Sequence, residues 1–276
     1  MKMPPILFGT FQEPEPNQNT MNRIIKCALE NGCRGFDTSP SYNTETKLGF
    51  SLNNLIKAGL LSRDKVYISD KIDGMQIYES DGNIYKYVIN SIRKINCSYL
   101  DLCLIHWPFL DYIENVWHNL LRLKNDGKIR NIGICNVTRR KLEEIHDRIK
   151  MFPDVIQNEI SPLNYDYDVE FFQNNNIIVQ AYSPLCRLEF RRVLFRSKSD
   201  VLNELASKYN RNIAQIILNW HRQRGIVPVF SSKKEERIIS NLNESDFVFT
   251  KDEMEKIKSL DEGYKIFPYS FACPGY

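Results

Sequence analysis

Four ionisable side chains of this sequence follow short apolar runs, at the points where strands would end. Asp37 and Tyr42 lie in RGFDTSPSYN, and Lys71 and His106 follow in ISDKI and LIHWP. A free tyrosine has a pKa of about 10, so it donates a proton at neutral pH only where a cation stabilises its phenolate. Asp37 would hold Lys71, and Lys71 would supply that cation to Tyr42. A neutral His106 would hydrogen-bond a substrate carbonyl, so the set predicts an acid that protonates oxygen.

These four side chains include no group that attacks carbon. The attacking group, such as a hydride, must therefore come from a cofactor. Each residue alone has an ordinary structural explanation: Asp37 as a helix cap, Lys71 as a solvated charge, His106 and Tyr42 as core side chains. Their joint occurrence at three successive strand ends favours the catalytic interpretation.

The elements that would position these residues alternate along the whole chain. Eight β-branched or aromatic runs are each followed by a segment with helical periodicity, and several runs are apolar almost throughout, which is typical of parallel strands covered on both faces. This pattern predicts one α/β domain over residues 1–276, a parallel eight-stranded (β/α)8 TIM barrel whose functional groups lie at the carboxyl ends of the strands. The alternative, an open doubly wound sheet, usually carries a glycine-rich turn, and no two glycines here are spaced G-x-G.

Composition narrows the possible functions. With 42% hydrophobic and 26% charged residues and a net charge of +3, the chain is typical of a globular protein and shows no nucleic-acid or membrane surface. Its seven cysteines contain no C-x-x-C pair, which favours core thiols over a metal site or disulfides. No apolar run is long enough to span a membrane, and the N-terminal residues do not resemble a signal peptide. We expect a cytoplasmic monomer.

Several motifs in order resemble those of the aldo-keto reductases, NAD(P)H-dependent carbonyl reductases built on this barrel. GFDTSPSY, ISDKI and YLDLCLIHWP are similar to the family segments that carry its aspartate and tyrosine, its lysine and its histidine. GKIRNIGICNVT, VIQNEISPLN and AYSPL are similar to three further family runs. The resemblance covers nearly the whole chain and implies that Asp37, Tyr42, Lys71 and His106 form the catalytic tetrad.

The resemblance also implies a dinucleotide site and a small-molecule carbonyl substrate. Asn136 and Gln157 would hold the nicotinamide carboxamide, and Tyr182 would stack on its ring. The other residues implied along the cofactor are Gly9, Thr10, Asp37, Cys135, Ser183, Leu185, Ser231, Ser232, Arg237 and Asn241. The substrate is not identified by the sequence, and Phe11, Trp107 and Tyr264 are the expected pocket walls.

Two departures from the family pattern bear on the cofactor. Cys135 stands where the family has a serine, which removes a good hydrogen-bond donor but keeps the volume. Ser231 stands where a lysine often contacts the 2′-phosphate, and Lys233 and Lys234 could replace it from the start of the next helix. NADPH is therefore the expected cofactor, with NADH as the alternative.

Two other functions compete with carbonyl reduction. A barrel can keep a nicotinamide site and serve as a regulatory or scaffold protein. A metal-dependent hydrolase would need clustered ligands at strand ends, but the chain has four histidines, and His118, His146 and His221 fall in helical segments. The intact tetrad argues against the first alternative, and we expect no metal.

Residues 188–197 resemble translated adapter DNA more than a natural part of this protein. LEFRRVLFRS, residues 188–197, is the translation of CTG GAG TTC AGA CGT GTG CTC TTC CGA TCT, which resembles a widely used sequencing adapter. We therefore expect an insertion in the loop after the seventh strand and exclude it from functional reasoning.

Overall fold

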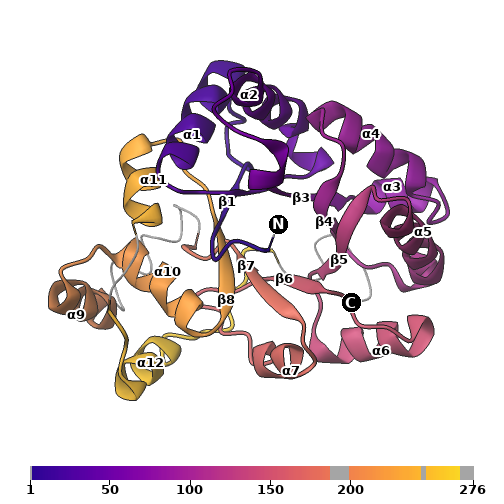
Figure 1. Cartoon of the computed structure of the whole chain (residues 1–276). Coiled ribbons are helices and arrows are strands. Elements are labelled where there is room, and N and C mark those ends of the chain that lie inside the picture. Colours follow the sequence, from indigo (N-terminus) through magenta and orange to yellow (C-terminus); the bar gives the residue numbers. More distant parts are fainter. Residues whose placement is uncertain (1, 187–198, 244–246, 268–276) are drawn as a thin grey trace.

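The computed structural model of the chain is a closed barrel of parallel strands, which confirms the (β/α)8 fold expected from the sequence. The strands pair in chain order, and the last returns to the first (Figure 1). The structure describes residues 2–186, 199–243 and 247–267. The strands are β1 Leu7–Gly9, β2 Gly35–Asp37, β3 Tyr67–Ile72, β4 Leu100–Ile105, β5 Ile129–Cys135, β6 Val155–Glu159, β7 Ile178–Tyr182 and β8 Ile226–Phe230.

Helices form the outer ring around this barrel (Figure 1). They are α1 Gln18–Glu30, α2 Glu45–Lys57, α3 Gly74–Glu79, α4 Tyr85–Ile95, α5 Ile113–Asn125, α6 Arg139–Ile149, α7 Val169–Asn174, α9 Ser199–Tyr209, α10 Ile213–Gln223, α11 Glu235–Leu242 and α12 Lys251–Lys258, with 3-10 turns at Pro40–Tyr42, Arg63–Lys65 and Leu110–Tyr112. The alternating pattern does not predict α3, which has only 6 residues, or α12, which follows no strand. Within the described residues, no helix has the length and apolar character needed to cross a membrane.

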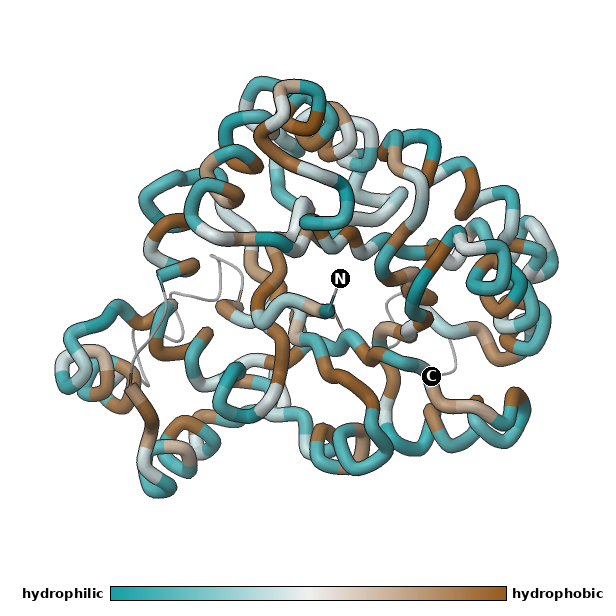
Figure 2. The backbone as a smooth tube through the Cα atoms, viewed as in Figure 1, coloured by the Kyte–Doolittle hydropathy of each residue, from teal (hydrophilic) through white to brown (hydrophobic). Residues whose placement is uncertain are grey.

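The strands are covered on both faces. Every residue of β3 and β4 is buried, and Figure 2 shows hydrophobic colour along the strands and hydrophilic colour on much of the outer ring. Inside the barrel, a small set of apolar side chains forms one buried cluster. Its members are Leu7, Tyr67, Leu102, Leu104, Cys135, Val155 and Val229, and Met3 packs against them. Two of its members, Leu104 and Cys135, stand level with Lys71 and Gln157 in the strand pairing, so this cluster lies directly beside the polar residues.

The register of the strands brings the chemically useful side chains close together. Side chains alternate along a strand, so Ser69 and Lys71 share the inner face of β3. Asp37 lies beside Ser69 in the β2–β3 pairing, and Gln157 lies beside Cys135 in the β5–β6 pairing. Both pairings lie at or near the carboxyl ends of β2 and β5. The barrel thus collects these groups at one mouth, as the sequence predicted.

Asp70, between Ser69 and Lys71, points to the opposite face of β3 and gives a testable pH dependence. Its side chain is buried, and neither carboxylate oxygen accepts a hydrogen bond within the described residues. Burial raises the pKa of Asp70 well above its ordinary value. The folded state therefore binds this proton more tightly than the unfolded state, and stability falls as the pH rises from about 4 toward the folded pKa. We expect Asp70→Asn to remove this loss, which can reach about 1.4 kcal/mol per pH unit.

Urea unfolding at pH 5 and pH 8 measures this effect. The unaltered protein should lose more free energy of unfolding between the two values than Asp70→Asn does. Asp147→Asn is the matched control, because the Asp147 side chain is 81% exposed. If Asp70→Asn shows the same loss as the unaltered protein, burial does not perturb this carboxyl group.

Candidate active site

A buried ion pair forms the base of the site. Asp37, the last residue of β2, accepts a 2.5 Å hydrogen bond from Lys71 Nζ through Oδ1. Its Oδ2 accepts from Ser69 Oγ and Gln157 Nε2, both at 3.1 Å, and Lys71 Nζ also donates to the carbonyl of Thr38 at 2.9 Å. Burying two charges is costly unless their remaining hydrogen bonds are made, and here both partners have further polar contacts.

The Tyr42 ring lies directly against this ion pair. Tyr42 ends the short turn that follows β2, and the centroid of its ring is 4.8 Å from Lys71 Nζ. The rings of Phe11 and His106 lie 5.0 and 5.8 Å from it, centroid to centroid. Three strand ends and the β1–α1 segment therefore meet around one phenol.

Burial and the neighbouring charges determine the protonation states of Tyr42 and Lys71. Burial raises the pKa of the Tyr42 phenol above its ordinary value, and the nearby Lys71 charge acts in the opposite direction without cancelling it. Burial alone would lower the pKa of Lys71, but the carboxylate of Asp37 outweighs it and the pKa lies above its ordinary value. At neutral pH the site therefore holds a protonated phenol beside an ammonium, which is the arrangement a proton donor to oxygen needs.

His106, the residue after β4, contacts a carboxylate that the sequence analysis did not assign to the site. Its Nδ1 is 2.8 Å from Oδ1 of Asp73, and the Ser39 hydroxyl donates to the same oxygen at 3.0 Å. Asp73 immediately follows β3 and precedes α3. In the sequence it looks like a helix cap, so only its distance from His106 reveals a link to the site.

Asn136 connects the ends of three strands. Its backbone has φ of +58°, a left-handed conformation that asparagine tolerates better than most residues, and its N–H donates to the Gln157 carbonyl at 3.1 Å. The side-chain Nδ2 donates to the His106 carbonyl at 2.9 Å, and Oδ1 accepts from the Tyr182 hydroxyl at 2.7 Å. The amide thereby fixes the Tyr182 phenol at the mouth.

Comparison with known proteins assigns the family. The model of the aldo/keto reductase family matches residues 5–262. The chain belongs to this family. Two bacterial relatives span nearly its whole length. The glyoxal reductase of Bacillus subtilis (strain 168) is 32% identical over 270 residues, covering 97% of this chain and 92% of the relative. The methylglyoxal reductase DkgA of Escherichia coli (strain K12) is 29% identical, covering 96% and 92%.

Solved structures agree with this assignment. MGS-M4, an aldo-keto reductase enzyme from a Medee basin deep-sea metagenome library, superposes with a TM-score of 0.86 at 28% identity, covering 97% of this chain and 95% of that chain. The aldo-keto reductase of Bombyx mori, solved in complex with NADP, has the same fold, with a TM-score of 0.84 at 23% identity and 97% and 92% coverage. The chain is thus an NAD(P)H-dependent aldo-keto reductase, as its motifs predicted.

In this aldo-keto reductase, Gln157 lies deep in the barrel. Both of its amide hydrogens have partners, Asp37 Oδ2 at 3.1 Å and Gln180 Oε1 at 2.7 Å. Gln157 Oε1 is 4.0 Å from Cys135 Sγ, a weak contact that leaves acceptor capacity on this oxygen. Burial raises the pKa of the Cys135 thiol, so Cys135 acts here as a neutral, compact core group.

The residues expected along the dinucleotide lie mainly around the ends of β1, β7 and β8. Thr10, which follows Gly9, is buried, and its hydroxyl is 2.7 Å from that of Thr44. Ser183 has φ of +49°, Leu185 packs partly buried against the core, and Ser231 and Ser232 follow β8. Thr10 thus ties the β1 end to the start of α2, and the serines remain near the surface.

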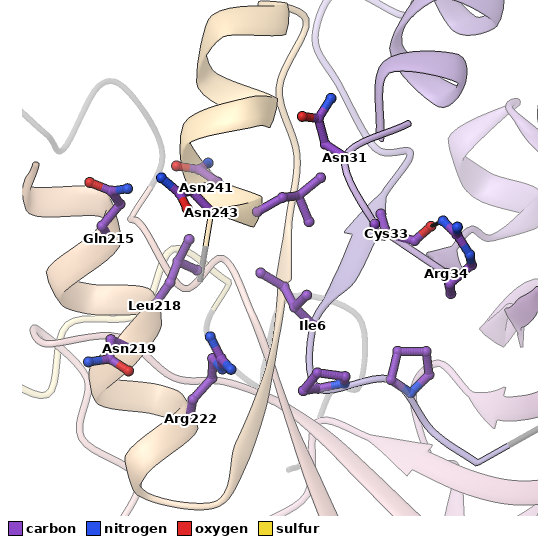
Figure 3. A pocket seen from close by; sticks show the side chains of 14 residues that line it. Ile6, Asn31, Cys33, Arg34, Gln215, Leu218, Asn219, Arg222, Asn241 and Asn243 are labelled. Carbon is purple, nitrogen blue, oxygen red and sulfur yellow. Dashed lines mark hydrogen bonds between the residues drawn. The ribbon is translucent and has the colours of Figure 1, made fainter. Parts of the chain in front are cut away.

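Arg237 and Asn241, both expected along the cofactor, belong to α11. Arg237 is exposed near the start of this helix. Asn241, near its end, lines a pocket of about 310 Å³ that Figure 3 shows between α10, α11 and the segments before β1 and β2. This pocket lies at the end of the barrel where the strands start, opposite the Asp37–Lys71 pair. The structure therefore does not bring Asn241 into the tetrad cluster.

The three residues expected as pocket walls come from three different segments. Phe11 contacts the Tyr42 ring, Trp107 is buried after β4, and the Tyr264 backbone N–H donates to the Leu163 carbonyl at 2.9 Å. Glu159, at the end of β6, accepts hydrogen bonds from the backbone of Ile266 and Phe267, which anchors the segment that carries Tyr264. Residues 188–197 lie outside the described residues, so their adapter origin stays a prediction.

Proposed function

We propose that this protein reduces an aldehyde or ketone to an alcohol with NADPH, and that Tyr42 protonates the carbonyl oxygen. The observation that supports this most is the Tyr42 ring packed against the buried pair of Lys71 and Asp37. The relatives named glyoxal and methylglyoxal reductase favour a small, reactive carbonyl compound as substrate.

The proton transfer follows from the contacts of Tyr42. As electrons collect on the carbonyl oxygen, the O–H bond of Tyr42 breaks and its proton moves to that oxygen. The phenolate that remains is stabilised by Lys71 Nζ, which Asp37 and the Thr38 carbonyl hold in place. NADPH would supply the hydride that the carbonyl carbon accepts. Positioned acids of this kind contribute about a hundredfold to ten-thousandfold in rate.

The residues at the mouth fit a nicotinamide dinucleotide in their donor and acceptor groups. Asn136 uses one amide hydrogen and one lone pair within the protein, so one of each remains for a carboxamide. Gln157 Oε1 would accept from the same carboxamide, and the Tyr182 ring would stack on the nicotinamide. Gln12 Oε1, in the β1–α1 segment, is buried without a hydrogen-bond donor among the described residues, while Gln12 Nε2 donates to the Ser232 carbonyl at 3.2 Å. Gln12 Oε1, next to β8, would accept a hydrogen bond from a hydroxyl of the ribose.

The basic residues after β8 favour a 2′-phosphate. Lys233 Nζ donates to the Pro14 carbonyl, and Lys234 is 4.0 Å from Glu236. The Arg237 side chain has no hydrogen-bond or ion-pair partner among the described residues, so its guanidinium is available for a phosphate. We expect Arg237→Ala to weaken NADPH binding by about tenfold, the effect of one charge-assisted contact, and to leave NADH binding unchanged.

Calorimetric titration of both cofactors measures this preference. Arg140→Ala is the matched control, because the Arg140 side chain on α6 is 81% exposed and pairs only with Glu144 among the described residues. Equal dissociation constants for NADH and NADPH in the unaltered protein would refute the preference for NADPH.

One assay separates this function from its alternative. The loss of NADPH absorbance is followed with methylglyoxal and with a simple aromatic aldehyde. Oxidation of NADPH that depends on the carbonyl compound supports a reductase, whereas tight cofactor binding without turnover would indicate a regulatory or scaffold protein. The monomeric state and the cytoplasmic location stay predictions.

A further inference from the structure

Gln180, in the middle of β7, is a fully buried amide that the sequence analysis did not assign to the site. It lies beside Gln157 in the β6–β7 pairing, and its Oε1 accepts a hydrogen bond from Gln157 Nε2 at 2.7 Å. Gln157 Nε2 also donates to Asp37 on β2, which is not a neighbour of β6, so this bond crosses the barrel interior. Gln180 therefore belongs to a chain of polar groups inside the barrel that ends at the buried ion pair.

The ion pair determines the orientation of both amides. The carboxylate of Asp37, which pairs with Lys71, only accepts hydrogen bonds, so Gln157 must turn Nε2 and not Oε1 toward Asp37 Oδ2, 3.1 Å away. The second hydrogen on this nitrogen then requires an acceptor on Gln180, which is Oε1. The Gln180 Nε2 consequently faces Met3, whose Sδ is a weak acceptor 3.4 Å away.

Two hydrogen bonds to one nitrogen fix the plane of the Gln157 amide. With Asp37 as its single acceptor, the amide could still rotate about that hydrogen bond. Gln180 accepts from the other hydrogen and removes this freedom. The remaining group of the amide, Gln157 Oε1, thus has a fixed direction, and its contact among the described residues is the weak one with Cys135 Sγ at 4.0 Å.

We infer that Gln180 is a positioning residue for the nicotinamide, because it holds Gln157 Oε1 in the orientation that accepts a hydrogen bond from the cofactor carboxamide. This inference rests on the proposed use of NADPH. Gln180 acts through Gln157, and its own amide makes no bond to the tetrad. A carboxamide has N–H donors for Oε1, whereas an acetyl group at the same ring position has none and leaves that oxygen unpaired. The fixed amide therefore discriminates between these two groups.

This discrimination is measured by binding alone, with NADPH and its 3-acetylpyridine analogue, which has a methyl group in place of the amide nitrogen. Gln180→Met keeps the length of the side chain and removes its amide oxygen. We expect the ratio of Kd values, analogue over NADPH, to fall by about fivefold to tenfold in this variant, the effect of one hydrogen bond. Other differences between the two cofactors cancel, because only the change in the ratio is compared. An unchanged ratio would overturn the inference, as would equal Kd values in the unaltered protein.

Met3→Leu is the matched control. Met3 packs against the apolar cluster inside the barrel, and this substitution of similar volume removes the contact with Gln180 Nε2 while leaving Gln180 Oε1 in place. We expect its ratio of Kd values to match that of the unaltered protein. An equal fall in both variants would mean that any disturbance of the barrel interior has this effect, which would refute a positioning role for Gln180.

Hydrogen exchange tests the same contact without a cofactor. In protein labelled with 15N, a Gln157→Glu variant identifies the side-chain amide signals of Gln157. Both amide protons should exchange slowly with water in the unaltered protein, and one should exchange faster in Gln180→Met. Fast exchange of either proton in the unaltered protein would contradict the inference, even if Gln180→Met does not fold. If the unaltered protein does not bind NADPH, the cofactor proposal fails, and the exchange rates still decide whether Gln180 holds Gln157.

Discussion

Tyr42→Phe is expected to lower kcat by at least about a hundredfold while leaving the Kd for NADPH nearly unchanged. The substitution removes only the hydroxyl, so the ring keeps its contacts with Phe11 and His106. The carbonyl oxygen then loses its proton donor as charge develops on it. Single-turnover kinetics with a small aldehyde, together with fluorescence titration of NADPH, separate the chemical step from cofactor binding.

A second tyrosine serves as the control for this change. Tyr85, on α4, donates its hydroxyl to Asp126 at the surface, and Tyr85→Phe should retain full activity. Activity within a factor of two in Tyr42→Phe would exclude Tyr42 as the acid. Loss of NADPH binding in this variant would instead assign Tyr42 to the cofactor site.

Local patterns predict that Asp37, Tyr42, Lys71 and His106 meet, and the structure brings them together, while their catalytic role stays a proposal. Asp37, Lys71 and His106 each stand at or next to the carboxyl end of an apolar run, and in a parallel barrel such ends meet at one mouth. The closure of the sheet then determines which side chains meet. The structure brings Lys71 to Asp37 across neighbouring strands whose register could not be read from either run alone.

The residues that sequence reasoning missed depend on distances that local patterns do not contain. Asp73 and His106 are separated by 33 positions, and an aspartate before a short helix is more often a cap than part of a site. The depth of Gln157 in the barrel likewise depends on Gln180 and Asp37, from two other strands. The helix α12 did have a local signal, the Thr250 and Glu253 capping box, but it falls outside the strand–helix alternation.

The buried ion pair of Lys71 and Asp37 affects both the surroundings of Tyr42 and the stability of the fold. The Lys71 side chain is fully buried, and its charge is balanced by Asp37 alone among the ion pairs of the described residues. Removing one partner would leave the other charge buried without compensation, which costs about 3–5 kcal/mol. Buried ion pairs are often no more stable than apolar pairs of similar volume, so this pair is consistent with the role proposed for the phenol above it.

Lys71→Met is expected to lower kcat by at least about a hundredfold and to destabilise the fold by about 3–5 kcal/mol. The phenolate of Tyr42 loses the cation that opposes the effect of burial on its pKa. That pKa therefore rises further, and the alkaline limb of any residual activity moves to higher pH. Rate measurements across the alkaline range and urea unfolding test the two effects separately.

The double variant Asp37→Asn/Lys71→Met distinguishes the chemical role of Lys71 from its structural one. Removing both charges should recover most of the lost free energy of unfolding, because no uncompensated charge remains, whereas the rate should stay low without a cation beside Tyr42. Lys26→Met, on the exposed side of α1, controls for the substitution itself, since the Lys26 side chain is 61% exposed. An unchanged pH profile in Lys71→Met would contradict the electrostatic support of Tyr42. Recovery of the rate in the double variant would show that Lys71 only stabilises the fold.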